Sequence, residues 1–346
     1  MTASKSQHGV HSDGELRVDN GCGLSMTVSP FGARLVELLV PDREGQADNV
    51  TLGFDDSDSY RRNVNLYFGA TVGRVAGRIA GGEFWREGQR FQLACNEGSN
   101  HLHGGRDRSL DRVEWSSQPI TTERGPGVLF EYVSPHLEEG YPGNLTVRSE
   151  YSLSTQNELW TVLTAVSDAS TPVNLTNHTY WSLNGGAPGS ILDHELMIAA
   201  GDVVSTSDDL IPTGGLDPVA GTPLDFRRPH TIGERLPGDC SQPWPGFDNA
   251  YVLDAHDMSD VVASLWDPIS GRSMDIMTSE PSLQVYTANR LAHMSGRGGR
   301  FYGAGSAICL EPQSRPDAFS KPDLGSIMLP IGVEYRHMSR YRFSVR

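Results

Sequence analysis

The sequence predicts an all-β fold, in the form of one large antiparallel β-sandwich. Three observations support this prediction. Short stretches with strand-type alternation recur along the whole chain, helical periodicity is scarce, and 38 glycines and 21 prolines are spread between the stretches rather than gathered in a linker. Many short strands separated by turn residues are typical of sandwiches and barrels. With 346 residues, the chain is long enough to bury one sizeable core.

The strands are easiest to place where the alternation is strict. Residues 145–153 (LTVRSEYSL) alternate apolar and polar side chains, and the polar TQNE leads into a second such stretch at residues 159–168. The two stretches predict an antiparallel hairpin. Other short strands are expected at residues 34–42, 273–279 and 283–289. Brief helical turns are indicated only in a few pieces such as DDSDSYRRNV, residues 55–64.

The start of the chain, residues 1–12, is polar and predicts a flexible tail. It lacks the apolar segment of a secretory signal, and no run approaches the roughly 18 apolar residues of a membrane helix. No composition shift divides the remainder, so residues 13–346 are expected to form a single domain. The cysteines are scattered, at Cys22, Cys95, Cys240 and Cys309. Two disulfide bridges are one alternative, but buried reduced thiols in a cytoplasmic protein are favoured.

The charge balance argues against large anionic partners. Lys and Arg number 28 and Asp and Glu 43, which gives a formal net charge of −15. Nucleic acids and anionic membranes attract basic surfaces, so neither is an expected partner. A neutral small molecule is compatible with this charge. We expect a monomer or a homodimer.

The stretch VNLTNHTYWSLNGG, residues 173–186, alternates like a strand but carries many polar groups. In an extended strand, His178 and Tyr180 would share one face and Trp181 would lie on the other. A lone histidine in a strand is usually structural. The neighbouring Asn177 and the two aromatic rings add weight to a sugar site, since amides and aromatic rings suit sugar rings, but this segment alone does not decide between the two.

Two glycine-rich segments carry basic side chains. In residues 69–84, Arg74 and Arg78 are interpreted first as surface arginines that pair with nearby acids, and the segment lacks the GKS or GKT ending of a phosphate-binding loop. In NEGSNHLHGG, His101 and His103 would project to the same face of a strand and bind a metal, as in cupins. The glutamate that normally follows such a pair is absent, so hydrogen-bonding histidines at a glycine turn are favoured.

Two acidic residues lie at strand ends. Asp248 in PGFDNAYVL, taken by itself, is better explained by an Asx turn that leads into a strand. Glu311 follows the apolar Ile308–Leu310 and precedes a proline loop, where a buried carboxylate is costly unless it is paired or used. Burial would raise its pKa and suit it to act as a base near neutrality. A structural ion pair with an arginine such as Arg78 remains the alternative.

Taken together, the motifs GATVGRVAGRIAGG, NHLHGG, VNLTNHTYWSLNG, GFDNAYVL, LQVYTAN and CLEPQSRPDA resemble, in this order, those of the aldose 1-epimerase (galactose mutarotase) family. The resemblance extends from about Gly23 to the C-terminus. It implies a β-supersandwich fold and the interconversion of the α and β anomers of free hexoses without cofactor or metal.

The resemblance also implies roles for single residues. Glu311 would be the general base and His178 the general acid. The implied sugar contacts are Arg78, His103, Asp248 and Gln284. From their place beside His178, Asn177 and Tyr180 are further candidate sugar contacts, and Tyr180, Trp181 and Tyr286 are candidate rings for packing on the sugar. Gly77 departs from the family, because many members carry an asparagine there that contacts the sugar.

This interpretation requires His178 and Glu311 to meet in one sugar-sized cleft. With ordinary pKa values near 4.3 for Glu and 6.5 for His, a carboxylate and a substantial fraction of imidazolium would coexist at neutral pH. Three rival interpretations stay open. They are a non-catalytic carbohydrate-binding sandwich, a metal-dependent cupin that uses His101 and His103, and an epimerase-fold enzyme for an unusual sugar or biosynthetic intermediate.

Overall fold

The computed structural model describes residues 9–10, 14–185, 189–236, 246–316, 318, 321 and 325–346. Within them the regular secondary structure consists mainly of antiparallel strands, and the two α-helices, α1 (Ser57–Arg62) and α2 (Ile232–Arg235), are short. The predicted antiparallel β-sandwich is therefore confirmed. None of the helices in these ranges is long and apolar enough to cross a membrane.

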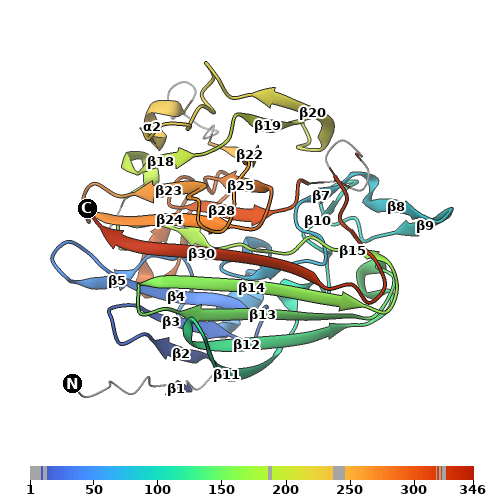
Figure 1. Ribbon diagram of the computed structural model, residues 1–346, viewed down its shortest axis with the longest axis horizontal. Coiled ribbons are helices and arrows are strands. Elements are labelled where there is room, and N and C mark those ends of the chain that lie inside the picture. The colour runs from blue at the N-terminus through green and yellow to red at the C-terminus, as the bar shows by residue number, and fades with distance from the viewer. Residues whose placement is uncertain are drawn as a thin grey trace.

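The largest sheet has nine strands, and its long strands form the layer nearest the viewer in Figure 1. Their spatial order is β11 (Ser116–Thr122), β12 (Gly125–Ser134), β13 (Leu145–Leu153), β14 (Glu158–Ser167), β30 (Tyr335–Val345), β24 (Arg272–Thr278), β23 (Ala263–Trp266), β18 (Glu195–Ile198) and β21 (His230–Thr231). Strands β13 and β14 form the predicted hairpin, in which Leu153 pairs with Leu159.

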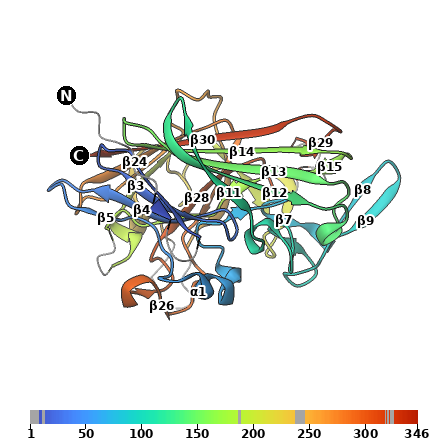
Figure 2. The ribbon, with the colours of Figure 1, turned by 90° about the horizontal axis from the view of Figure 1, so that it is seen from below.

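Two further sheets lie behind this layer. The six-stranded sheet has the order β17 (Tyr180–Trp181), β28 (Ile308–Gln313), β25 (Ser282–Tyr286), β22 (Asp248–Val252), β19 (Asp202–Thr206) and β20 (Pro212–Pro218). The five-stranded sheet runs through β1 (Gly9–Val10), β2 (Leu16–Asp19), β3 (Ser25–Ser29), β4 (Arg34–Pro41) and β5 (Ala47–Asn49). Figure 2 shows β11–β14 and β30 as one layer and β3–β5 as part of a second.

Small two-stranded ribbons complete the fold. They pair β10 (His101–Leu102) with β7 (Arg78–Ile79), β15 (Thr171–Pro172) with β29 (Met328–Leu329), β16 (Thr176–Asn177) with β6 (Thr71–Val72), β26 (Met294–Ser295) with β27 (Phe301–Tyr302), and β8 (Glu83–Arg86) with β9 (Gln89–Gln92). The β8–β9 hairpin projects from one end of the molecule (Figure 1).

The other predicted elements are also confirmed. Residues 34–42, 273–279 and 283–289 correspond to β4, β24 and β25, and residues 55–64 contain α1. Helix α1 begins after Asp56 because the Asp56 side chain accepts a hydrogen bond from the Ser59 backbone N–H, as an N-cap residue does. The expected flexible tail, residues 1–12, lies outside the described residues apart from β1, which pairs with β2.

The main hydrophobic core lies between the layers. It contains buried side chains from all three large sheets, among them Val28, Leu35, Val147, Leu163 and Ile308. The cluster spans the sequence from Leu16 to Phe343. This continuity supports our proposal that residues 13–346 form a single domain, because one core buries apolar surface from the whole length.

The prediction of one continuous strand at residues 173–186 was wrong. The segment forms two separate two-residue strands, β16 paired with β6 and β17 paired with β28. All its residues from Val173 to Leu183 are buried, so it passes between layers and has no solvent-facing side. Its apolar residues Val173, Leu175, Trp181 and Leu183 belong to the hydrophobic core. Gly186, at its end, lies outside the described residues.

Candidate active site

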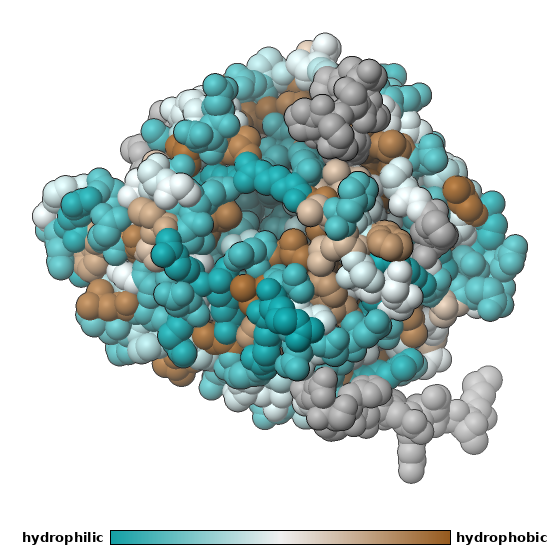
Figure 3. Space-filling model, turned by 180° about the vertical axis from the view of Figure 1, so that it is seen from behind, coloured by the Kyte–Doolittle hydropathy of each residue, from teal (hydrophilic) through white to brown (hydrophobic). Residues whose placement is uncertain are grey.

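A cavity of about 180 Å³ opens beside the six-stranded sheet and is lined by residues from β17, β22, β25, β28 and the loops that cover them. One water needs roughly 10–15 Å³ on this measure, so the cavity holds about a dozen water-sized groups, which matches one hexose. Figure 3, viewed from behind Figure 1, shows a hollow with a largely hydrophilic rim on the face opposite the nine-stranded sheet.

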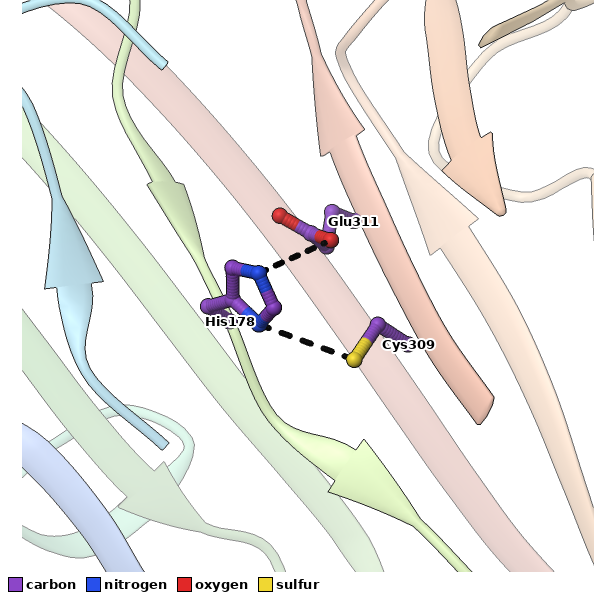
Figure 4. A group of neighbouring side chains, drawn as sticks. All are labelled: His178, Cys309 and Glu311. Atoms are coloured by element: carbon purple, nitrogen blue, oxygen red, sulfur yellow. Dashed lines mark hydrogen bonds and ion pairs between the residues drawn. The ribbon is translucent and has the colours of Figure 1, made fainter. Parts of the chain in front are cut away.

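His178 and Glu311 meet at the base of this cavity. The His178 Nε2 atom lies 3.6 Å from Glu311 Oε1, and both side chains are almost fully buried (Figure 4). Glu311 lies within β28, and His178 lies between β16 and β17. The backbone of His178 is fixed by hydrogen bonds in both directions, from its N–H to Ala70 O and from Gly69 N–H to its carbonyl. The structure thus brings together the two side chains that the interpretation required to meet.

The protonation of this pair differs from the sequence-based expectation. Burial raises the pKa of Glu311 well above its ordinary value, and the nearby Asp248 adds to the rise. Burial lowers the pKa of His178 to about 4. Both neutral forms are favoured in the free protein, because a low-dielectric interior opposes charge. The expectation of a resting imidazolium beside a carboxylate is therefore wrong. The neutral pair and the ion pair nevertheless carry the same number of titratable protons, namely one.

One oxygen of Glu311 has no partner in the described part of the chain. Oε2 is buried and accepts no hydrogen bond there, while Oε1 faces His178. Leaving a buried carboxyl oxygen unpaired is unfavourable, and such atoms in native proteins usually serve a ligand or water. A sugar hydroxyl donating to this oxygen would satisfy it.

Cys309 is a neighbour of the pair that the motif reasoning overlooked. Its Sγ lies 3.6 Å from Nδ1 of His178, on the ring edge opposite Glu311 (Figure 4). Cys309 and Glu311 are two residues apart on β28 and so project to the same face. The two-residue spacing between Cys309 and Glu311 was the feature of the sequence that could have identified Cys309 as a neighbour of the pair. The expectation of a buried free thiol is confirmed for Cys309, whereas Cys22 is free but exposed, Cys95 is free but half-buried, and Cys240 lies outside the described residues.

Within the described ranges, one group of side chains has the proximity needed to hold a metal ion. It consists of His178, Cys309 and Glu311, whose ligand atoms lie within 4.8 Å of one another. Burial raises the pKa of the Cys309 thiol as well as that of the Glu311 carboxyl. Protons therefore compete strongly with any metal at these two atoms, since a metal binds the thiolate and the carboxylate.

Arg78 and Asp248 line the cavity, as the resemblance implied. The Arg78 guanidinium donates two hydrogen bonds to the Glu97 carboxylate, of 2.6 and 2.9 Å. The alternative ion pair between Arg78 and Glu311 is therefore not formed. Asp248 begins β22, where its carboxylate accepts a 2.7 Å hydrogen bond from Gln284 Nε2. Gln284 also lines the cavity, on the neighbouring strand β25.

His101 and His103 do not project to a common face. His103 lines the cavity and has a left-handed backbone (φ 52°). Its ring packs against those of Tyr67 and His178, with centroids 4.8 and 5.4 Å away. His101 is fully buried elsewhere, between Ala94 O and the Tyr141 hydroxyl. The left-handed turn at His103 breaks the strand geometry on which the H-x-H metal alternative depended.

The predicted contacts around His178 divide into two groups. Tyr180 and Tyr286 line the cavity, and the Tyr180 ring stacks on His178 with centroids 5.1 Å apart. Asn177 is not in the cavity wall. Its amide donates to Gly69 O and the Tyr151 hydroxyl, so it supports the loop behind the site. Trp181 is buried in the hydrophobic core beside Tyr341. Direct sugar contact by Asn177 and Trp181 is thus contradicted by their positions.

Arg74 and Gly77, both from the glycine-rich segment, have different surroundings. Arg74 is buried rather than at the surface, and its guanidinium donates to the Ser134 hydroxyl and to backbone carbonyls, including those of Pro142 and Gly143. Its role in the fold is structural, but it pairs with carbonyls instead of the expected acids. Gly77 lies in the cavity wall with φ 78°, and its N–H donates to His103 Nδ1.

Three further wall residues were not singled out from the sequence. The Tyr67 ring packs against those of both His103 and His178, and Glu97 accepts hydrogen bonds from both Arg78 and Arg290. Tyr67 and Arg290 come from segments that carry no strong pattern, whereas Glu97 lies within NEGSNHLHGG, residues 96–105. The position of Glu97 in that segment, shortly before His101 and His103, was the one signal in the sequence for these three residues.

Comparisons with known proteins agree with this arrangement. The family model for aldose 1-epimerase matches residues 15–342. The galactose mutarotase of Rattus norvegicus is 40% identical over 332 residues, which cover 96% of this chain and 93% of that protein. The aldose 1-epimerase of Escherichia coli (strain K12) is 31% identical over 332 residues, covering 95% of this chain and 94% of that protein.

Solved structures show the same fold. A GalM/aldose epimerase homologue from C. elegans superimposes with a TM-score of 0.88 at 28% identity, covering 98% of this chain and 99% of the other. Galactose 1-epimerase from Lactobacillus acidophilus NCFM gives 0.84 at 28% identity, with 99% of each chain covered. The family model matches nearly the whole chain, and the sequence identity to the two relatives extends over most of it. The chain therefore belongs to the aldose 1-epimerase family.

Proposed function

We propose that the protein is an aldose 1-epimerase that interconverts the α and β anomers of free hexoses such as glucose and galactose. The observation that carries this proposal is the buried His178–Glu311 pair, 3.6 Å apart in a cavity of hexose size. Mutarotation opens a cyclic hemiacetal and closes it again on the other face. It needs one group that takes a proton and one that gives a proton, and no electron is transferred.

The proposed reaction begins with both groups in contact with the sugar. Glu311 takes the proton from the anomeric hydroxyl while His178 gives a proton to the ring oxygen, and the bond between C1 and the ring oxygen breaks. The open-chain aldehyde rotates about C1–C2. Glu311 then returns its proton to the carbonyl oxygen as His178 takes one from the C5 hydroxyl, so the ring closes with the other configuration. Each such acid–base contribution is typically about 10² to 10⁴-fold.

The carboxylate and imidazolium that this reaction needs can form from the neutral resting pair. Moving one proton from Glu311 to His178 turns the neutral pair into carboxylate and imidazolium without changing the net charge of the site. Sugar hydroxyls that donate to the free Oε2 atom would stabilise the carboxylate, since hydrogen bonds to a charged form favour it. We infer that substrate binding itself promotes this shift.

We assign the remaining wall residues to substrate positioning. Arg78, His103, Asp248 and Gln284 offer donors and acceptors for sugar hydroxyls, and their mutual hydrogen bonds and those to Glu97 hold them in place. Tyr180 and Tyr286 offer apolar ring faces. Rigid placement of such groups lowers the entropic cost of reaching the transition state.

The decisive experiment is polarimetry of freshly dissolved α-D-glucose and α-D-galactose with and without the protein. Faster decay of the optical rotation is expected for both sugars. Binding of either sugar without faster decay would instead identify a non-catalytic carbohydrate-binding protein. Acceleration confined to other sugars would favour the epimerase-fold enzyme of altered specificity.

We also propose a cytoplasmic location and a monomeric or homodimeric state. Free thiols at Cys22, Cys95 and Cys309 support the location, because reduced cysteines are typical of reducing compartments. Cell fractionation tests the first proposal, and light scattering of the purified protein tests the second.

A further inference from the structure

The Cys309 thiol contacts the proposed general acid but does not reach the cavity. Its Sγ lies 3.6 Å from Nδ1 of His178, while Nε2 of the same ring faces Glu311 (Figure 4). His178 and Glu311 line the cavity, whereas Cys309 is fully buried and is not among the described residues of the cavity wall. The two edges of the imidazole therefore face different surroundings. The thiol can affect a sugar in the cavity only through the ring of His178.

The thiol is held in a fixed position. Cys309 lies on β28, where it pairs with Tyr180 on one side and with Tyr286 on the other. The Tyr180 side chain is hydrogen-bonded to the thiol, and the Tyr180 ring stacks on that of His178. In the described part of the chain, Cys309 is the one other residue to which the His178 ring is hydrogen-bonded. The ring also forms a hydrogen bond with the backbone of His178 itself, and this bond favours a proton on the ring.

The position of the single proton on neutral His178 decides whether the proposed reaction can start. A neutral imidazole carries its proton on one nitrogen, and the partner of the other nitrogen determines which one. In the proposed reaction Glu311 passes a proton to Nε2, and Nε2 passes it on to the ring oxygen of the sugar. Nε2 must therefore hold a free electron pair at rest, and the resting proton must be on Nδ1. With the proton on Nε2 instead, His178 could not receive one from Glu311.

The sulfur of Cys309 is suited to accept a hydrogen bond from Nδ1–H. A thiol is both a weak donor and a weak acceptor. Burial raises the pKa of the Cys309 thiol well above its ordinary value, and the nearby Glu311 adds to the rise. The sulfur therefore stays a neutral thiol and keeps its own proton. The Tyr180 hydroxyl can accept the S–H group, since a hydroxyl both donates and accepts, and an electron pair of the sulfur is then free for Nδ1–H.

A neutral partner suits this site better than the carboxylate that orients the histidine in Ser-His-Asp triads. A carboxylate beside Nδ1 stabilises the imidazolium. Here it would also place a further negative charge near Glu311 and Asp248, in an interior that opposes charge. The thiol orients the ring without adding a charge, so both members of the pair can remain neutral at rest.

From these contacts we propose that Cys309 is a positioning residue for the general acid. Its sulfur accepts a hydrogen bond from Nδ1–H of His178 and holds the imidazole in the tautomer whose Nε2 is open toward Glu311 and the sugar. The role in the reaction rests on the proposed function. The tautomer is a property of the resting protein and can be tested without it.

Nitrogen NMR tests the tautomer directly. In protein with ¹⁵N-labelled histidine, correlations from the carbon-bound ring hydrogens to the two nitrogens distinguish a protonated nitrogen from a bare one. The His178 signals are assigned among those of the 11 histidines by their loss in His178→Asn. At pH 7, above the His178 pKa of about 4, the wild type should carry the proton on Nδ1. A proton on Nε2 would overturn the inference, and this measurement requires no variant of Cys309.

Two substitutions of Cys309 separate hydrogen bonding from packing. Cys309→Ser keeps an acceptor at this position, whereas Cys309→Val fills the space with methyl groups and offers none. Cys309→Val should lower kcat for α-D-galactose roughly ten-fold or more with KM unchanged, because the donor is charged in the imidazolium and hydrogen bonds to charged groups contribute on this scale. Cys309→Ser should retain most of the wild-type kcat and the proton on Nδ1. Cys22→Ser and Cys22→Val are the controls and should match the wild type, since Cys22 is exposed and lines no part of the cavity.

A purely structural role predicts the opposite order of the two variants. Cys309 belongs to a buried apolar cluster with Phe68 and Tyr180, so packing alone favours valine over serine, and the melting temperatures should follow that order. A kcat for Cys309→Val equal to or above that of Cys309→Ser would overturn the inference. A wild type that does not accelerate mutarotation, but carries the proton on Nδ1 and loses this preference in Cys309→Val, would instead reject the proposed function and retain the hydrogen bond that sets the tautomer.

Discussion

The substitution Glu311→Gln tests the proposed base with little change in shape. The amide has almost the volume of the carboxyl, but it cannot take a proton from the anomeric hydroxyl. Loss of one general acid–base group should lower kcat by about 10² to 10⁴-fold, equivalent to roughly 3–5 kcal/mol in activation free energy. Polarimetry with α-D-galactose measures this change directly.

The same variant should not lose stability. Burial raises the pKa of Glu311 in the folded protein above its value in the unfolded chain. The contribution of such a group to stability is fully present below its unfolded pKa of about 4.3, and it is lost progressively as the pH rises to the folded pKa. The glutamine stays neutral at every pH. The melting temperature of the variant should therefore equal that of the wild type near pH 4 and exceed it by a growing margin as the pH rises, already at neutrality.

Glu131→Gln provides the control, because Glu131 pairs with Arg148 on exposed β-sheet surface and lines no part of the cavity. Its kcat should match the wild type. The assignment of Glu311 as base would be refuted if Glu311→Gln kept more than about a tenth of the wild-type kcat, given the contribution expected of a general base. If the variant had a much lower melting temperature at pH 8, the pKa argument would be refuted instead.

Three other predictions follow from the cavity wall. The acid limb of the pH profile of kcat/KM should lie near pH 4, where His178 is protonated and the pair gains its second proton. An acid limb at the ordinary histidine pKa, near 6.5, would contradict the effect of burial. Asp248→Asn removes a negative charge that raises the pKa of Glu311, so the alkaline limb of kcat/KM should move to lower pH while KM for galactose rises; an unmoved limb would exclude the coupling. Gly77→Asn should lower KM for galactose, because asparagine tolerates the backbone φ of 78° and the nearest atom to a new Cβ is Pro316 Cβ, at 3.4 Å. Gly77→Val should lower the melting temperature instead, because valine does not tolerate this φ.

Local pattern was sufficient to predict the sandwich and several of its strands. The β13–β14 hairpin, β4, β24 and β25 were predictable because alternation with period two is a property of adjacent residues. The order of the nine-stranded sheet was not, since it joins β14, in the middle of the chain, to β30, near its C-terminal end. The break between β16 and β17 was missed for a related reason. A segment buried on both sides alternates between two interior environments, and the sequence does not distinguish this from alternation between core and solvent.

The candidate site was predicted in part, and the resemblance to a family carried more of it than physical reasoning on single motifs. Every motif had an ordinary structural explanation, and for Arg74 the structural role was the correct one. The position of Asn177 behind the site and the Glu97 grip on Arg78 depend on contacts between distant segments. Contacts of this kind leave no periodic pattern of residues in the sequence.

The pKa values of the central pair show why burial suits this reaction. An exposed Glu and His would together hold one proton only between about pH 4.3 and 6.5, because outside that window the pair gains or loses one. In the protein, His178 takes up a second proton only near pH 4, and the raised pKa of Glu311 delays loss of the single proton. The one-proton window therefore keeps its lower edge and extends upward. Mutarotation begins and ends with one proton on the pair in both directions, so the desolvation that opposes charge in the site also maintains the state from which either anomer can react.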